Sequence, residues 1–249
     1  MKKHDFRTRK TSQHHNMIQE ELKNMSINIA IDGPAGAGKS TIAKKVAKEL
    51  SFIYVDTGAM YRAIALYMLR NGIDVKEETA VSAACPEIQV MIAYEDGEQR
   101  ILLNGEDVSL LIRKEEVGNA ASAVAVYAAV RSKLTELQKM LAQTQNVVMD
   151  GRDIGSAVLP HAQVKIYLTA SVHTRAGRRS KELEEKGETA DIHIIEKDIE
   201  ERDYQDMHRA ISPLCQAEDA VLVDSSDMGI DEAVSYTHLR AHETEADLV

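Results

Sequence analysis

Short apolar runs alternate along the chain with longer segments in which apolar residues recur at helical spacing. The short runs are rich in β-branched residues and predict strands at 27–31, 52–55, 147–149, 164–168 and 220–223. The longer segments predict helices at 40–50, from 57 to about 70, and at about 114–142, 172–186 and 191–211. Because strands that alternate with helices form parallel sheets, the pattern predicts an α/β fold with a doubly wound, five-stranded parallel sheet.

A predicted β-hairpin interrupts this alternation. Its two strands cover 88–94 and 100–104 and are joined around Gly97, which favours an insert of antiparallel β-structure. Residues 1–24 are polar, carry basic residues and lack apolar periodicity, so we expect a disordered or non-native extension. Met25 directly precedes the first strand and is a candidate start of translation.

Composition narrows the function classes. The net charge of −10 disfavours a nucleic-acid partner, since proteins that bind polyanions are normally basic. No apolar run approaches the length of about 18 residues that predicts a membrane span. Cys85 and Cys215 lack the spacing of a metal site, and free thiols fit a cytoplasmic protein. No interface signal stands out, and we expect a monomer.

The most specific motif directly follows the first strand and matches the P-loop pattern G-x-x-x-x-G-K-[ST]. Its glycines let backbone N–H groups face a phosphate chain, and the helix N-terminus adds a partial positive charge. Lys39 can reach the β- and γ-phosphates, and the Ser40 hydroxyl can bind Mg²⁺. We therefore predict a site for ATP with Mg²⁺. The motif consists of Gly33, Pro34, Ala35, Gly36, Ala37, Gly38, Lys39, Ser40 and Thr41.

Polar residues also follow the second and third predicted strands. Ligands in doubly wound sheets bind at the carboxyl ends of the strands, so these residues should open on the same crevice as the P-loop. Thr57 and Arg62 could face a second, phosphate-bearing substrate, although Thr57 could equally be a helix cap. Asp150 is placed for the Mg²⁺ shell, and Arg152 for a bidentate phosphate contact.

Two later helices carry charged stripes. Arg175, Arg178 and Arg179 share one helix face, and so do Arg202, Asp206 and Arg209. Such stripes are usually solvated, but three crowded arginines repel one another unless an anion lies among them. The segment between the stripes, 185–191, has the composition of a loop that could close over ATP.

The histidines are scattered and indicate no catalytic base. A phosphate monoester is largely ionised at neutral pH, with a second pKa of about 6, so it needs no base to act as a nucleophile. Positioning and charge neutralisation then suffice, which favours a phosphate group as the acceptor.

The motifs at 33–41, 56–62, 119–122, 150–153 and 202–214 together resemble those of the bacterial cytidylate kinases, in the same order and spacing from about residue 25 to 234. The resemblance implies transfer of the ATP γ-phosphoryl to CMP or dCMP. It also implies an NMP-binding insert at about 72–113 and a helical lid at about 175–205.

The resemblance further implies roles for individual residues. Ser122, Arg131 and Asp153 are expected to read the cytosine. Arg62, Arg152 and Arg209 would hold the acceptor phosphate, and Asp206, with Arg202 nearby, would meet the ribose. The lid arginines Arg178 and Arg179 would meet the transferred phosphoryl. The expected catalytic residues are Lys39, Arg152, Arg178, Arg179 and Arg209.

Other functions stay open on the residues alone. The acceptor could be UMP or AMP, and a P-loop could also belong to a nucleotide-dependent switch protein. Residues 235–249 depart from the family pattern and resemble a translated sequencing adapter. We therefore expect a foreign tail, a truncated final helix and an exposed apolar patch.

Overall fold

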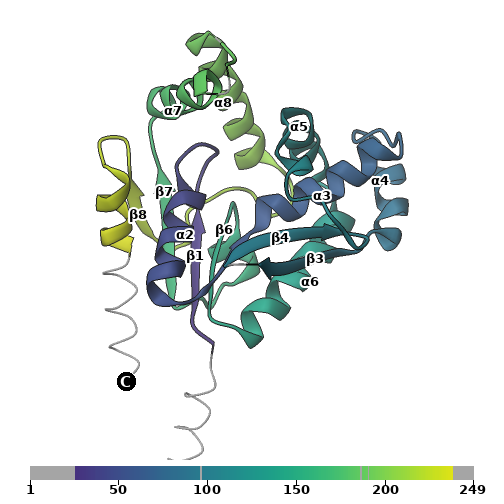
Figure 1. The fold of residues 1–249 in the computed structure, drawn as a ribbon, viewed down its shortest axis with the longest axis horizontal. Helices are drawn as coiled ribbons and strands as arrows, with labels where there is room; N and C mark the ends of the chain where they lie inside the picture. The colour runs from purple at the N-terminus through teal and green to yellow at the C-terminus, as the bar shows by residue number, and fades with distance from the viewer. Residues whose placement is uncertain (1–25, 96, 186, 190, 238–249) are drawn as a thin grey trace, which may run out of the picture.

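A parallel sheet runs through the centre of the computed structural model (Figure 1). The structure describes residues 26–95, 97–185, 187–189 and 191–237, and within them five strands pair in the order β2-β6-β1-β7-β8. This arrangement confirms the predicted doubly wound sheet. The strands are β1 (Asn28–Asp32), β2 (Ile53–Asp56), β6 (Val147–Gly151), β7 (Val164–Thr169) and β8 (Val221–Asp224).

Helices cover both faces of the sheet because the strand side chains alternate between two apolar clusters. Ile29 and Ile31 of β1 pack against α2 (Lys39–Leu50), whereas Ala30 faces the opposite cluster. That second cluster includes side chains of α3 (Thr57–Arg70) and of the helices that follow the insert. The central strand is thus buried on both sides, as expected for a parallel sheet.

The prediction of a single continuous helix at about 114–142 is wrong. The segment forms two helices, α5 (Glu115–Val124) and α6 (Ala128–Thr144), with a break at residues 125–127. One local and one long-range hydrogen bond lie at the break. The freed carbonyl of Ala125 accepts from Arg131 at 3.3 Å, and the Tyr127 hydroxyl donates to the Val75 carbonyl at 3.1 Å.

The predicted hairpin is present and has a third strand that the sequence pattern did not indicate. Its strands are β3 (Val90–Glu95), β4 (Glu98–Leu103) and β5 (Glu106–Asp107), and α4 (Glu78–Ala84) precedes them. Hydrogen bonds join the insert to the backbone of β2. Gln99 accepts the Asp56 amide at 2.8 Å, and the Tyr94 hydroxyl donates to the Tyr54 carbonyl at 3.0 Å.

Two helices, α7 (Val172–Glu185) and α8 (Ile192–His208), extend beyond the carboxyl edge of the sheet (Figure 1). They share a small apolar cluster of Ala176, Leu183 and Ile195. Helix α8 ends three residues before the expected position. Residues 186 and 190 of the expected closing loop lie outside the described residues.

The two ends of the chain lie largely outside the described residues. This holds for all of 1–24 and for 238–249 of the expected tail. Residues 230–237 are helical, and Ala233, Val234 and Thr237 are buried there. No helix in the described part of the chain is long and apolar enough to cross a membrane.

Candidate functional site

The P-loop connects the end of β1 to the start of α2, as the sequence predicted. Gly33 begins the loop with φ of 148°, and a Cβ atom there would lie 1.9 Å from the Leu168 carbonyl oxygen. Gly36 has φ of 76°, and its missing side chain leaves room for Arg175, whose Cβ would be 3.3 Å from a Cβ on Gly36. Glycine is therefore required at these positions for conformation and for space.

Lys39 lies almost fully buried beneath the loop. Its ammonium donates to the Pro34 carbonyl at 2.7 Å. Burial, together with the positive charge of Arg152, lowers the pKa of Lys39 to about 7. The two cations belong to the two predicted halves of the site, so their interaction indicates that these halves are neighbours.

Ser40 and Asp150 meet beside the loop. The Ser40 hydroxyl donates to Oδ2 of Asp150 at 2.8 Å, and the Tyr54 hydroxyl donates to Oδ1 at 3.0 Å. Burial raises the pKa of Asp150 to about 6, with a further contribution from Asp56. A hydroxyl and a carboxylate are hard oxygen ligands, and this donor set fits Mg²⁺.

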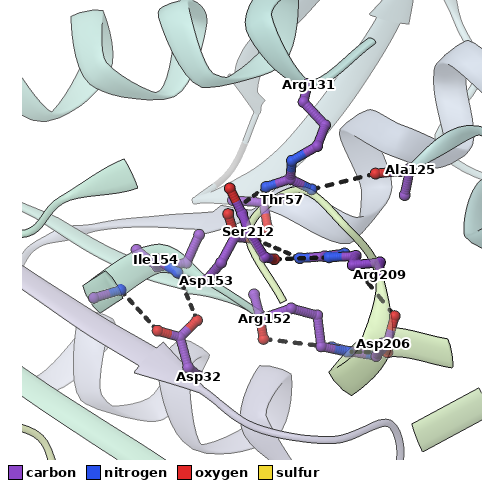
Figure 2. A network of polar contacts seen from close by, with 12 residues as sticks. Asp32, Thr57, Ala125, Arg131, Arg152, Asp153, Ile154, Asp206, Arg209 and Ser212 are labelled. Carbon is purple, nitrogen blue, oxygen red and sulfur yellow. Dashed lines mark hydrogen bonds and ion pairs between the residues drawn. The ribbon is translucent and has the colours of Figure 1, made fainter. Parts of the chain in front are cut away.

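The acceptor-side residues Arg152 and Asp206 form an ion pair between the end of β6 and helix α8. The Arg152 Nε donates to Oδ2 of Asp206 at 2.8 Å (Figure 2). Burial opposes ionisation of Asp206, yet the guanidinium of Arg152 holds the pKa of that carboxyl below its ordinary value. The structure thus brings together two residues that are 54 positions apart in the chain.

Asp153 links two of the predicted substrate residues (Figure 2). Its carboxylate accepts from Arg131, and from Arg209 at 3.1 Å. Arg209 also donates to the Ser212 carbonyl at 2.7 Å. Ser122 is on α5, where its hydroxyl donates to the Gly118 carbonyl at 3.5 Å.

Arg62 and Arg202 are half-buried cations of the site, on which carboxylates act only at longer range. Within the described residues, neither guanidinium has a hydrogen bond or an ion pair, and the Nε of Arg202 is buried. Burial lowers the pKa of Arg202 to about 10, with repulsion from Arg152 and Arg62 adding to the effect. Burial also lowers the pKa of Arg62. Half-buried cations that repel one another are costly, and a bound anion would remove that cost.

Two of the three arginines of α7 reach a common place, since Arg175 and Arg178 both donate to carbonyls of the P-loop, Arg178 to that of Ala37 at 3.4 Å. That an anion lies among the three stays a prediction. Arg175 pairs with Asp203 at 2.6 Å and donates to the Ala35 carbonyl of the P-loop at 3.1 Å. Arg178 donates to the Ser225 carbonyl at 2.7 Å. Arg179 instead reaches Glu115 and Glu182, at 3.5 Å and 3.4 Å.

Thr57 is not the cap of α3. That position belongs to Asp56, whose side chain accepts the Ala59 amide at 2.9 Å. The buried Thr57 hydroxyl donates to the Asp150 carbonyl at 2.7 Å and so joins α3 to the end of β6. Its contact with a substrate stays a prediction.

A family model described as cytidylate kinase matches residues 29–242. The chain belongs to the cytidylate kinase family. Its relatives in this family include cytidylate kinases of three bacteria. That of Lactobacillus gasseri is 48% identical over 85% of this chain and 92% of its own length. That of Enterococcus faecalis is 49% identical over 84% of this chain and 92% of its own length. That of Desulforamulus reducens is 52% identical over 83% of this chain and 93% of its own length.

Sequence reasoning missed three residues that shape the site in this cytidylate kinase family member. Tyr54 bonds to Asp150, Arg113 of the insert lies 3.4 Å from the carboxylate of Asp56, and Asp32 accepts two backbone amides. A signal existed for Asp32, because it ends an apolar strand as Asp56 and Asp150 do. No comparable signal marks Tyr54 or Arg113.

Proposed function

We propose that this protein transfers the γ-phosphoryl group of ATP to CMP or dCMP, giving ADP and CDP or dCDP. One observation carries the proposal: the cations Arg62 and Arg202, which have no hydrogen bond or ion pair among the described residues, lie beside Arg152 and thus next to the P-loop lysine. This arrangement supports a second phosphate site next to the first. The cytidine part rests on relatives that are named cytidylate kinase.

On the donor side, the N–H groups of residues 33–41 would cradle the phosphates of ATP, and Lys39 would neutralise the transferred group. Ser40 and Asp150 would hold Mg²⁺. When bound, Mg²⁺ would neutralise charge on the β- and γ-phosphates. The pKa of Lys39 is lowered in the protein alone. A bound triphosphate would favour its charged form.

On the acceptor side, Arg62, Arg152 and Arg209 would hold the phosphate of CMP, and Asp206, with Arg202, would meet the ribose. An oxygen of that phosphate attacks the γ-phosphorus, and the bond to the β-phosphate oxygen breaks. The acceptor is already ionised, so no proton has to be removed. The residues therefore position two anions and neutralise their repulsion.

Cytosine recognition would use Arg131, Asp153 and Ser122. The exocyclic amine of cytosine is a donor, which a carboxylate such as Asp153 can accept, and Arg131 can donate to the ring acceptors. UMP presents a carbonyl in place of that amine, so the same carboxylate would repel it. The assignments of Thr57 to the acceptor, and of Arg178 and Arg179 to the transferred phosphoryl, remain predictions, as do a monomeric state and a cytoplasmic location.

The test is ADP formation with CMP, dCMP, UMP and AMP as separate acceptors, for the wild type and for Lys39→Ala. We expect activity with CMP or dCMP well above that with UMP and AMP. Lys39→Ala should lower the rate on the order of a thousandfold, since it removes charge stabilisation of the transition state. A preference for AMP or UMP would refute the cytosine assignment, and ATP hydrolysis indifferent to every acceptor would refute the kinase.

A further inference from the structure

The carboxylate of Asp32 joins the two loops that build the site (Figure 2). Asp32 is the last residue of β1 and directly precedes Gly33 of the P-loop. Its Oδ1 accepts the amide of Ile154 and its Oδ2 the amide of Gly155, both at 2.7 Å. These two residues directly follow Arg152 and Asp153. One side chain on the donor strand thus holds the segment that carries two acceptor-side residues.

The surroundings leave this link little freedom to move. Asp32 is 4% exposed. A Cβ on Gly155 would lie 3.4 Å from Oδ2 of Asp32 and 3.2 Å from the Lys165 side chain. On the other side of Asp32, Gly33 has no room for a Cβ because the Leu168 carbonyl oxygen would be 1.9 Å away. A shift of either loop therefore disturbs the other.

A buried carboxylate is costly if it only fills space, because burial penalises its charge. Here both oxygens accept backbone N–H groups, and such charge-assisted bonds are shorter and stronger than neutral ones. The two bonds also fix direction, since both end on neighbouring amides of one turn, Ile154–Val158. The carboxylate is therefore suited to hold that turn in one place.

We propose that Asp32 is a positioning residue for the acceptor nucleotide: through Ile154 and Gly155 it sets where Arg152 and Asp153 stand relative to the P-loop. Arg152 holds Asp206, and Asp153 holds Arg131 and Arg209. If this turn moves, the ion pair of Arg152 with Asp206 and the contacts of Asp153 with the other two arginines therefore move with it. The proposal rests on the proposed function, in which CMP is the acceptor.

The first test is Asp32→Asn, assayed with CMP and ATP. The amide keeps the shape of the side chain but has one acceptor oxygen, so its NH₂ group faces one of the two backbone N–H groups. We expect kcat/KM for CMP to fall roughly 10- to 100-fold while the Kd of ATP changes less than about twofold. A merely structural role would lower the Tm without this split. An unchanged KM and kcat for CMP, or an equal loss of ATP binding, would overturn the proposal.

Two further variants keep the test decisive. Gly155→Ala keeps the Asp32 charge but brings a Cβ within 3.4 Å of Oδ2 of Asp32 and 3.2 Å of the Lys165 side chain, so it should give a smaller loss of the same acceptor-selective kind even if Asp32→Asn does not fold. Asp224→Asn is the matched control. Its exposed carboxylate also accepts a backbone amide, that of Ser226 at 2.9 Å, but lies at the end of β8, outside the NMP-binding insert. It should keep the wild-type kcat and KM for CMP.

Hydrogen exchange without substrates separates this proposal from the proposed function. In Asp32→Asn one of the two amides, that of Ile154 or that of Gly155, loses its hydrogen-bond acceptor and should exchange at least about tenfold faster. The amides of α2 should keep their wild-type exchange rates. Unchanged exchange at both amides would overturn the positioning role whatever the enzyme phosphorylates. The expected exchange in a protein that never phosphorylates CMP would refute the proposed function and the acceptor named here, but not the link between the loops.

Discussion

The Ser40 hydroxyl donates to the Asp150 carboxylate across 2.8 Å and thereby joins the first turn of α2 to the end of β6. The other oxygen of Asp150 accepts from Tyr54 of β2. Three neighbouring elements of the fold therefore converge on one carboxylate. Because a metal ion held by residues on rigid elements needs little rearrangement to bind, this convergence supports the Mg²⁺ position that we propose.

The first prediction concerns Asp150→Asn. The variant loses the negative charge next to the Ser40 hydroxyl, so the Mg²⁺ concentration for half-maximal ADP formation should rise roughly 10- to 100-fold. Mg²⁺ titration at saturating ATP and CMP measures this. Asp198→Asn, an exposed position on α8, removes the same charge and should leave the titration unchanged. Coincident curves for Asp150→Asn and the wild type would place Mg²⁺ elsewhere.

The second prediction compares two arginines of helix α3. Arg62→Ala should raise the KM for CMP about 10- to 100-fold, as expected for the loss of a charged hydrogen-bonding partner. It should spare ATP binding and should not lower the free energy of unfolding, because it removes a cation that burial and neighbouring arginines already penalise. Steady-state kinetics and urea unfolding measure the two effects.

Arg70→Ala provides the control for that comparison. Arg70 lies on the same helix but pairs with Glu106 at the surface, at 2.6 Å. Its loss should leave both substrates unaffected. If Arg62→Ala abolishes ATP binding instead, Arg62 belongs to the donor side and the placement of the acceptor phosphate is wrong.

Much of the fold could be predicted because its signals are local. Apolar runs marked the strands of the sheet, and the P-loop motif fixed the connection from β1 to α2. The break between α5 and α6 could not be predicted, because residues 125–127 contain neither glycine nor proline. One contact at the break comes from Arg131 in the helix that follows, and the other joins Tyr127 to Val75, which is distant in the chain.

Which residues belong to the candidate site could be predicted from the sequence, but which of them contact one another could not. The strand ends indicated that Asp150 and Arg152 would lie near the P-loop. The charged stripe on α7 placed three arginines on one helix face, yet Arg175 is buried against Asp203 whereas Arg179 is at the surface. Spacing along a helix gives a common face, and only the packing of neighbouring elements decides which side chain is buried on it.

The third prediction follows from that difference. Arg175→Ala should lower the free energy of unfolding by about 3–5 kcal/mol, since it leaves the buried Asp203 carboxylate without its partner. It should also weaken ATP binding, because Arg175 contacts the Ala35 carbonyl of the P-loop. Arg179→Ala breaks only surface pairs and should cost less than about 1 kcal/mol. Equal losses in urea unfolding would contradict the burial of Arg175.

The fourth prediction is a pH dependence of stability that arises from Asp32. Burial raises the pKa of this carboxyl to about 6, although its two backbone hydrogen bonds oppose the shift. Between about pH 6 and pH 4 the folded protein therefore binds this proton more tightly than the unfolded chain does. The ionised group costs stability above about pH 6, and that cost is relieved as the pH falls.

Asp32→Asn has no such charge and isolates the effect. The difference in the free energy of unfolding should move in favour of the wild type by about 2 kcal/mol between about pH 7.5 and about pH 4.5. Urea unfolding of both proteins at the two pH values measures it. Asp107 has a lowered pKa, because of its hydrogen bond from Ser109, so Asp107→Asn should show no such movement over this range. Parallel pH profiles for the wild type and Asp32→Asn would show that Asp32 titrates as an ordinary exposed carboxyl, and the burial argument would fail.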